Sequence, residues 1–334
     1  MRNSRLHRVV PLLGAAALTL APLGVRADDG LRLDYTAAGA RSLGLGGAFL
    51  GLADEASAAA ANPAGLTRLS QREITLGYSF GSFVYPGPRW SVAVHGRHLV
   101  DLTRRVGLSG ERTATTDLDL FAVGLSAAVE LTDDLSLGLG WEHHQLDLKS
   151  QTGGFATLDE TDQSGSARVG LLWRPARAWS IGGVYRQGLR FELGALDLEL
   201  PAVYGLGCAH QPTELWTFSL DVVRVEQADL VAALPVVERP LTFGGDATEI
   251  RFGAERNLPV RRGMVAVRVG FWHEPAPLHY RGENIVLQSL FPGGEDETHV
   301  TFGLGRSLTN LQVDAALDYS QRETRWSVSA GTRF

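Results

Sequence analysis

The chain has 334 residues, a formal net charge of −6 and one cysteine, Cys208. A single cysteine excludes an intrachain disulfide and a metal site built on several thiolates, and the acidic balance argues against a nucleic-acid partner, which would require a basic stripe. After residue 27 no stretch has the roughly 20 consecutive apolar residues that a membrane-spanning helix needs.

Residues 1–27 have the organisation of a secretory signal peptide. Arg2, Arg5 and Arg8 precede the apolar run VVPLLGAAALTLAPLGV, and the small residues Val25 and Ala27 stand where a signal peptidase reads the chain. The alternative is a permanent N-terminal anchor, against which Pro11, Gly14 and Pro22 argue. We therefore predict that residues 1–27 are cleaved.

The next segment, 28–72, contains the stretch GARSLGLGGAFLGLADEASAAAANPAGL at 39–66. Its glycines allow tight turns and close approach to other backbones, and its alanines can form a short, slim helix. Pro63 ends that helix, because the residue before a proline is pushed out of helical geometry, and Asn62 can bond to nearby backbone groups. The alternative is an unfolded Ala/Gly-rich linker.

From residue 74 onward the dominant period is two. In GMVAVRVGFW, for example, Val265, Val267 and Val269 share one face, while Ala266 and Arg268 share the other. Such alternation indicates strands with one wet and one apolar face. It is compatible with a soluble β-sandwich and with a membrane barrel.

Four further features favour the membrane barrel. The segments are about as long as the 9–11 residues that cross a bilayer on a tilt, and the chain ends on an alternating strand with a C-terminal aromatic, Phe334. Short connections alternate with long ones, and we expect the long connections at about 149–163, 189–200, 226–246 and 274–297. Aromatic residues stand near segment ends, as in the girdles of membrane proteins: Trp90, Trp141, Trp173, Trp179, Trp272, Tyr319 and Trp326.

Twelve strands are clear, and residues 72–87 hold either one more strand or a short pair. Single-chain bacterial barrels have an even number of strands, so we predict an all-β fold: a 14-stranded antiparallel transmembrane β-barrel over residues 73–334. The twelve clear strands are expected at 89–99, 117–130, 135–148, 164–173, 179–189, 201–210, 214–224, 247–256, 263–272, 298–306, 309–320 and 325–334. A lumen of that width needs a plug, and the segment 28–72 is the candidate.

Two groups of residues are candidates for sites. Charged residues on the polar faces of their strands should line the lumen, where they either pair and hold the plug or provide a polar route past it: Arg168, Glu249, Arg251, Glu255, Arg268, Asp314 and Asp318. The 226–246 loop is unusually apolar and could capture a ligand, dock a partner or pack on the rim; its apolar residues are Leu230, Val231, Leu234, Val236, Val237, Leu241 and Phe243.

No metal site and no enzyme are predicted. His143 and His144 are adjacent on a strand and face opposite sides, as do His95 and His98, so neither pair can chelate one ion. No serine has a distinctive nucleophile motif, and no cofactor is implied.

The 39–66 stretch, after a signal peptide and ahead of a barrel, resembles the N-terminal region of FadL-type transporters of hydrophobic compounds. It equally resembles their PorV-type relatives, some of which dock secreted proteins. The resemblance covers this stretch closely and the barrel only in layout. Its motif consists of the following residues: Gly44, Gly46, Gly47, Asp54, Asn62, Pro63, Ala64 and Gly65.

The resemblance implies an N-terminal hatch in the lumen and passive uptake of fatty-acid-like or aromatic compounds across the outer membrane of a Gram-negative bacterium. The expected partners are outer-membrane lipid and a hydrophobic small molecule, and we expect a monomer. The alternative is a PorV-like scaffold for a surface or secreted protein. The chain lacks the aromatic that often precedes Asn-Pro-Ala in the transporters, because residues 58–61 are all alanine.

Overall fold

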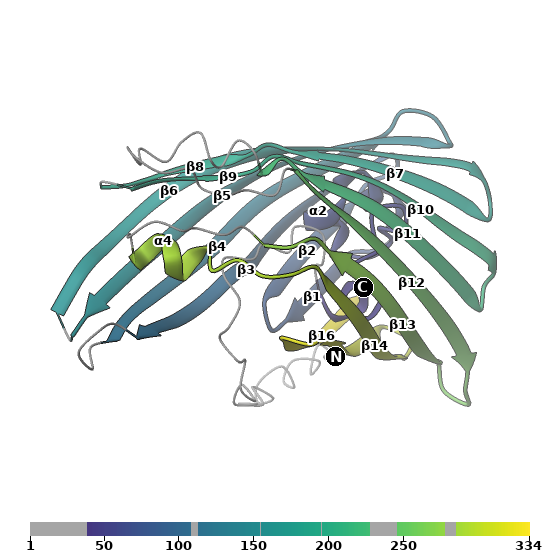
Figure 1. The fold of residues 1–334 in the computed structure, drawn as a ribbon. Helices are drawn as coiled ribbons and strands as arrows, with labels where there is room; N and C mark the ends of the chain where they lie inside the picture. The colour runs from purple at the N-terminus through teal and green to yellow at the C-terminus, as the bar shows by residue number, and fades with distance from the viewer. Residues whose placement is uncertain (1–38, 108–112, 154, 195, 228–245, 278–284) are drawn as a thin grey trace, which may run out of the picture.

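The computed structural model describes residues 39–107, 113–153, 155–194, 196–227, 246–277 and 285–334. In these ranges, fourteen strands form a closed barrel in which every neighbouring pair is antiparallel (Figure 1). The predicted 14-stranded barrel is therefore confirmed. No helix in the described ranges is long and apolar enough to cross a membrane.

The barrel strands follow the predicted order, and residues 72–87 do contain a short pair, β1 and β2. Pairing of β1 with β16 closes the barrel. The strands are β1 (Glu73–Gly77), β2 (Phe80–Pro86), β3 (Trp90–Gly107), β4 (Thr113–Glu130), β5 (Leu135–Thr152), β6 (Phe155–Ala176), β7 (Trp179–Arg186), β10 (Val203–Thr213), β11 (Trp216–Val225), β12 (Ala247–Pro259), β13 (Met264–Glu274), β14 (Glu297–Ser307), β15 (Leu311–Tyr319) and β16 (Thr324–Arg333).

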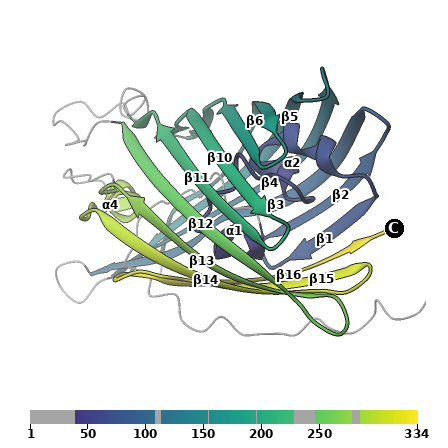
Figure 2. The ribbon, with the colours of Figure 1, turned by 90° about the vertical axis from the view of Figure 1, so that its right-hand side faces the viewer.

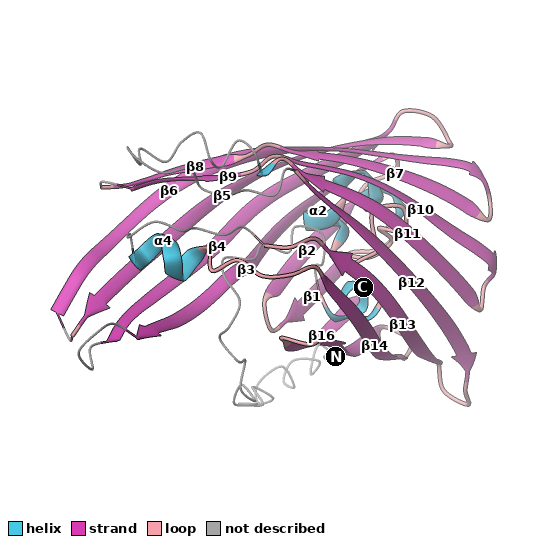
Figure 3. Cartoon of the chain, viewed as in Figure 1, coloured by secondary structure: helices cyan, strands magenta, loops and turns pink. Residues whose placement is uncertain are grey.

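A two-stranded hairpin and a few short helices complete the described fold (Figure 3). The hairpin, β8 (Leu189–Leu193) and β9 (Leu196–Leu200), is a separate sheet. The helices are α1 (Ala40–Gly44), α2 (Ala58–Ala61), the 3₁₀ helix η1 (Pro63–Arg68) and α4 (Ile285–Leu290).

The outer face of the barrel is apolar in the way that lipid requires. On β5, Leu137, Leu139 and Trp141 point outward, and Leu139 and Trp141 remain 55% and 54% exposed although they are large and apolar. The predicted girdle residues Trp90, Trp173, Trp179 and Tyr319 are also exposed. An apolar exterior around a closed barrel is the signature of a strand-built membrane protein.

Trp272 is not part of this girdle. Its side chain is only 4% exposed, and its ring stacks on His299 at 3.9 Å between ring centroids. The alternation of β13 explains the error, because Phe271 occupies the outward position and the next residue must then point inward.

Four strands are far longer than a bilayer crossing requires. β3, β4 and β5 each have 18 residues and β6 has 22, whereas about 9–11 suffice. These strands extend beyond the rest of the barrel at the left of Figure 1. The range 149–163 was expected to be a loop, but 149–152 continue β5 and 155–163 belong to β6.

The polarity of the long strands inverts along their length. On β5 the outward residues change from Leu139 and Trp141 to Gln145 and Lys149, while inward positions become apolar at Leu146. The part of each long strand that lies beside the rest of the barrel thus presents apolar groups to lipid. The part that extends beyond the rest of the barrel presents polar groups to water. The inversion places the membrane boundary on this side of the barrel near Trp141.

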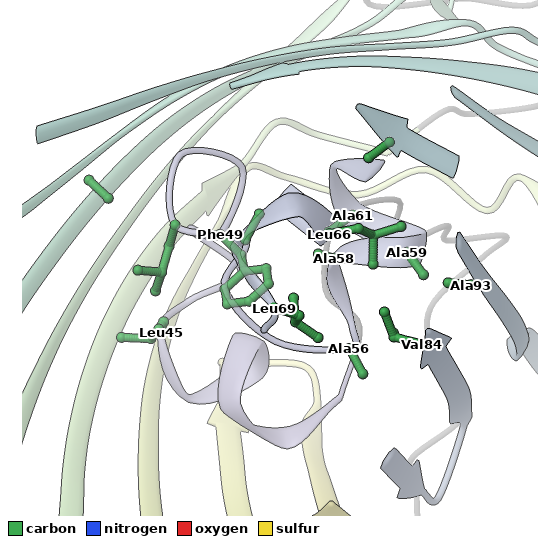
Figure 4. Close-up of a cluster of buried hydrophobic side chains, with 14 residues drawn as sticks. Leu45, Phe49, Ala56, Ala58, Ala59, Ala61, Leu66, Leu69, Val84 and Ala93 are labelled. Atoms are coloured by element: carbon green, nitrogen blue, oxygen red, sulfur yellow. The ribbon is translucent and has the colours of Figure 1, made fainter. Parts of the chain in front are cut away.

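Residues 39–72, called here the lumen segment, lie inside the barrel (Figures 1 and 2). Their apolar side chains form a buried core with four inward wall residues, Val84, Ala93, Ala128 and Ala209 (Figure 4). The lumen segment contributes Leu45, Phe49, Leu52, Ala53, Ala56, Ala58, Ala59, Ala61, Leu66 and Leu69. Small side chains dominate because the segment and the opposing walls must share one lumen.

Candidate functional site

The Asn62-Pro63-Ala64 motif is fitted against the wall formed by β5, β6 and β7. The Asn62 amide donates to the carbonyls of Leu50, at 2.9 Å, and Leu171, at 3.1 Å, and its oxygen accepts from the Ala64 N–H at 3.2 Å. The facing wall residues include Gly138 and Gly170, where an added Cβ would overlap the motif. One side chain therefore links two parts of the lumen segment to the barrel.

The glycine cluster of the motif forms a turn against β12 and β13. Gly46 and Gly47 have φ angles of 65° and 73°, which other residues rarely adopt. A Cβ on Gly46 would lie 2.8 Å from the Phe252 carbonyl oxygen, so the turn lies directly on the wall. The Thr301 hydroxyl accepts from the Gly46 N–H and donates to the Gly44 carbonyl, at 3.0 and 3.2 Å.

Arg41 is the electrostatic anchor of the lumen segment. Its guanidinium makes two hydrogen bonds of 3.0 Å to Glu255 of β12 and one of 2.5 Å to Asp54 of the motif, and a longer contact of 3.5 Å reaches Glu55. The two-pronged geometry suits a planar guanidinium and a carboxylate. Arg41 therefore joins α1, the 54–55 turn and the wall at a single buried point.

A further anchor is Asp221 of β11. One of its oxygens accepts hydrogen bonds from the Phe49 and Leu50 N–H groups at 2.7 and 2.8 Å. With the contacts of Asn62 and Arg41, this means that the lumen segment is bonded to strands on several sides of the barrel.

The seven charged residues singled out from the sequence are all buried on the inner face. Arg268 bridges Glu255 at 2.5 Å and Asp314 at 2.7 Å, and so extends the Arg41 network along the wall. Arg251 pairs with Glu249 on its own strand at 2.6 Å.

Arg168 and Asp318 belong to other clusters. Arg168 and Arg97 both bond to Glu142, at 3.0 and 2.9 Å, and His95 contacts the same carboxylate at 2.9 Å. Asp318 bonds to Arg325 and to His299, each at 2.9 Å.

Where β3, β4 and β5 extend beyond the charged wall, their inner face becomes apolar. A buried group of side chains from β3, β4 and β5 packs there with the β8–β9 hairpin and α4, and we call it the outer cluster. Its buried members are Val100, Leu118, Leu120, Leu146, Leu148, Leu189, Phe191, Leu193, Leu198, Leu200, Leu287, Leu290 and Phe291. This end of the barrel therefore has a buried apolar interior, which the hairpin and α4 cover.

The apolar loop residues proposed from the sequence for ligand capture, 230–243, lie outside the described residues. The outer cluster is the apolar site that sequence reasoning missed. A signal was present: the leucines of DLDLF on β4 and of QLDL on β5 occupy the face that carries small or polar residues elsewhere on the same strands.

Similar structures are known for the whole barrel. A Pseudomonas aeruginosa FadL homologue matches with a TM-score of 0.71 and 14% identity, over 91% of this chain and 99% of that one. The P. putida toluene transporter TodX gives 0.70 and 14%, and the Ralstonia pickettii toluene transporter TbuX gives 0.69 and 16%, each over 90% of this chain and 99% of the other.

The chain has the FadL-type fold. No protein-family model matches the sequence, and a search of curated proteins finds no relative. A closed barrel with an apolar outer face is the architecture of a β-barrel that spans a membrane.

Proposed function

We propose that the chain is a passive outer-membrane channel for hydrophobic small molecules. The outer cluster is the observation that carries the proposal. Beyond the lipid-facing band, the long strands present polar groups to water and leucines to the interior. An apolar solute that enters among these buried side chains gains free energy by leaving water, about 25 cal/mol per Å² of apolar area removed.

The structural neighbours support an apolar solute. They include two proteins described as toluene transporters and one described as a monoaromatic hydrocarbon channel, CymD. We therefore propose aromatic or fatty-acid-like compounds as the substrate class, captured at the outer cluster together with the 226–246 loop.

Passage inward requires the lumen segment to act as a hatch. Arg41 bonds to Glu255 of β12, the Phe49 N–H bonds to Asp221 of β11, and Asn62 bonds to a carbonyl of β6. A solute therefore passes only when some of these bonds between the segment and the wall open. We propose that the segment shifts within the barrel while its apolar core stays together.

The exit that we propose lies in the wall at β2 and β3. Gly96 of β3 faces outward and is directly paired with Gly81 of β2, so two glycines stand side by side in the sheet. The adjoining register shift between His98 and Val100 interrupts the pairing with β4. Glycine weakens a strand, and a bulge bends it, which makes this the point where the wall can part.

The test is uptake of a radiolabelled aromatic hydrocarbon by whole cells that lack their own channels and express this chain. The proposal predicts faster uptake than in cells with the empty vector, without dependence on an energised membrane. Equal uptake would reject it. A protein partner that co-purifies in a fixed ratio, without any effect on uptake, would favour the PorV-like scaffold.

A further inference from the structure

Three ligating side chains converge at the base of the segment that carries α4. Glu274 is the last residue of β13 and Glu297 the first of β14, and the two are direct partners across the sheet. His299, two residues further along β14, points to the same inner face. Each of the three residues offers one ligand atom, and these atoms come together at one place.

The distances fit a shared ion better than direct hydrogen bonds. His299 Nε2 lies 3.6 Å from Glu274 Oε2 and 3.9 Å from Glu297 Oε2, beyond the about 3.2 Å limit for N–H···O bonds. Ligands about 2.1 Å from a tetrahedral zinc ion stand roughly 3.4 Å apart. The three ligand atoms all lie within 4.8 Å of one another.

The opposite ring nitrogen is already held. His299 Nδ1 lies 2.9 Å from Asp318 Oδ1, and Trp272 stacks on the ring. A carboxylate accepts, so Asp318 favours the tautomer with the proton on Nδ1, in which Nε2 is the ligand atom that faces the two glutamates. A carboxylate that fixes the second nitrogen is the usual support of a metal-bound histidine. Asp318 is itself held by Arg325 at 2.9 Å.

We propose that Glu274, Glu297 and His299 form a site for a divalent transition ion of the zinc class. An imidazole ligand favours zinc over magnesium or calcium, which prefer oxygen alone. Three protein ligands leave one position for water. Because Glu274 and Glu297 stand at the two ends of the chain segment that bears α4, a bound ion clamps the base of an element that packs on the outer cluster.

Isothermal titration of the chelator-treated protein in detergent with ZnCl₂ tests the site. We expect one zinc per chain, not displaced by excess Ca²⁺, and binding lost in His299→Gln and in Glu274→Gln. Asp318→Asn should weaken binding about 10- to 100-fold. The matched control is His98→Gln, which removes another histidine paired with a carboxylate, Asp119 at 2.8 Å, outside the cluster.

Zinc affinity that changes less than threefold in both His299→Gln and Glu274→Gln would overturn the site, as would loss only in His98→Gln. Glu274 is only half-buried, so Glu274→Gln tests the site even if the buried His299→Gln variant folds poorly. Circular dichroism checks the folding of both variants. Zinc should also slow amide hydrogen exchange in 285–290, and unchanged exchange with zinc bound would refute the clamp. The result of the zinc titration does not depend on whether the chain takes up hydrophobic compounds.

Discussion

Replacing Arg41 with methionine tests whether charge holds the lumen segment in place. Methionine keeps much of the side-chain volume but removes the two hydrogen bonds to Glu255 and the contacts with Asp54 and Glu55. Glu255 retains Arg268 at 2.5 Å, whereas the structure gives Asp54 no other ion pair among the described residues. The variant therefore leaves buried carboxylate charge without its main partner.

The size of the effect follows from that burial. Removing one partner of a buried ion pair costs about 3–5 kcal/mol. If the cost falls on local opening of the lumen segment, the open population rises by roughly two to three and a half orders of magnitude. Because the segment has several other anchors, the barrel itself should keep its stability.

Amide hydrogen exchange of residues 40–66 measures the opening. We expect exchange to accelerate by about 100-fold or more in Arg41→Met, while the strands stay protected. The matched control is Arg190→Met, which breaks an exposed ion pair with Asp197 on the β8–β9 hairpin and should cost at most about 1 kcal/mol. If exchange in 40–66 is the same in Arg41→Met as in the wild type, the anchor role of Arg41 is wrong.

Three further predictions concern the gate, the entrance and the exit. Burial raises the pKa of Glu55 from 4.5 to about 7 against the opposing effect of Arg41. The stabilisation that Glu55 gives the folded segment is therefore complete below pH 4.5 and is lost as the pH rises through about 7, a change of about 3 kcal/mol. At pH 8, amide exchange in 40–66 should be faster in the wild type than in Glu55→Gln, and identical pH profiles of the two proteins would contradict this. Leu146→Ser should weaken binding of an apolar ligand, followed by tryptophan fluorescence, at least tenfold, whereas the lipid-facing Leu139→Ser should not; equal losses would remove the outer cluster from capture. Gly96→Val, whose added Cβ has an ordinary 3.5 Å contact with Phe121, should reduce uptake severalfold in a protein that still binds ligand, and unchanged uptake would place the exit elsewhere.

Strand number and direction could be predicted because period-two alternation and turn positions are local properties. The short β1–β2 pair followed from the even-number rule, and the inward charges followed from alternation alone. Arg268, Asp314 and Asp318 are buried on the inner face for the same reason that Val267 and Val269 are exposed on the outer one.

The partners of those charges could not be predicted. Arg41 and Glu255 are 214 residues apart, and Phe49 is 172 residues from Asp221. Such pairings depend on barrel register and on how the lumen segment turns, neither of which is encoded in a local pattern. The length of β3–β6 was also underestimated, because beyond Trp141 the polarity inverts and the alternation no longer reads as a membrane strand.

Native mass spectrometry of the protein purified from outer membranes in a mild detergent tests the central claim most directly. A passive channel for hydrophobic compounds predicts a bound apolar small molecule that is present in the wild type and in Leu139→Ser and absent in Leu146→Ser. A chain that carries no such molecule, and instead retains a protein partner in fixed stoichiometry, would contradict the account.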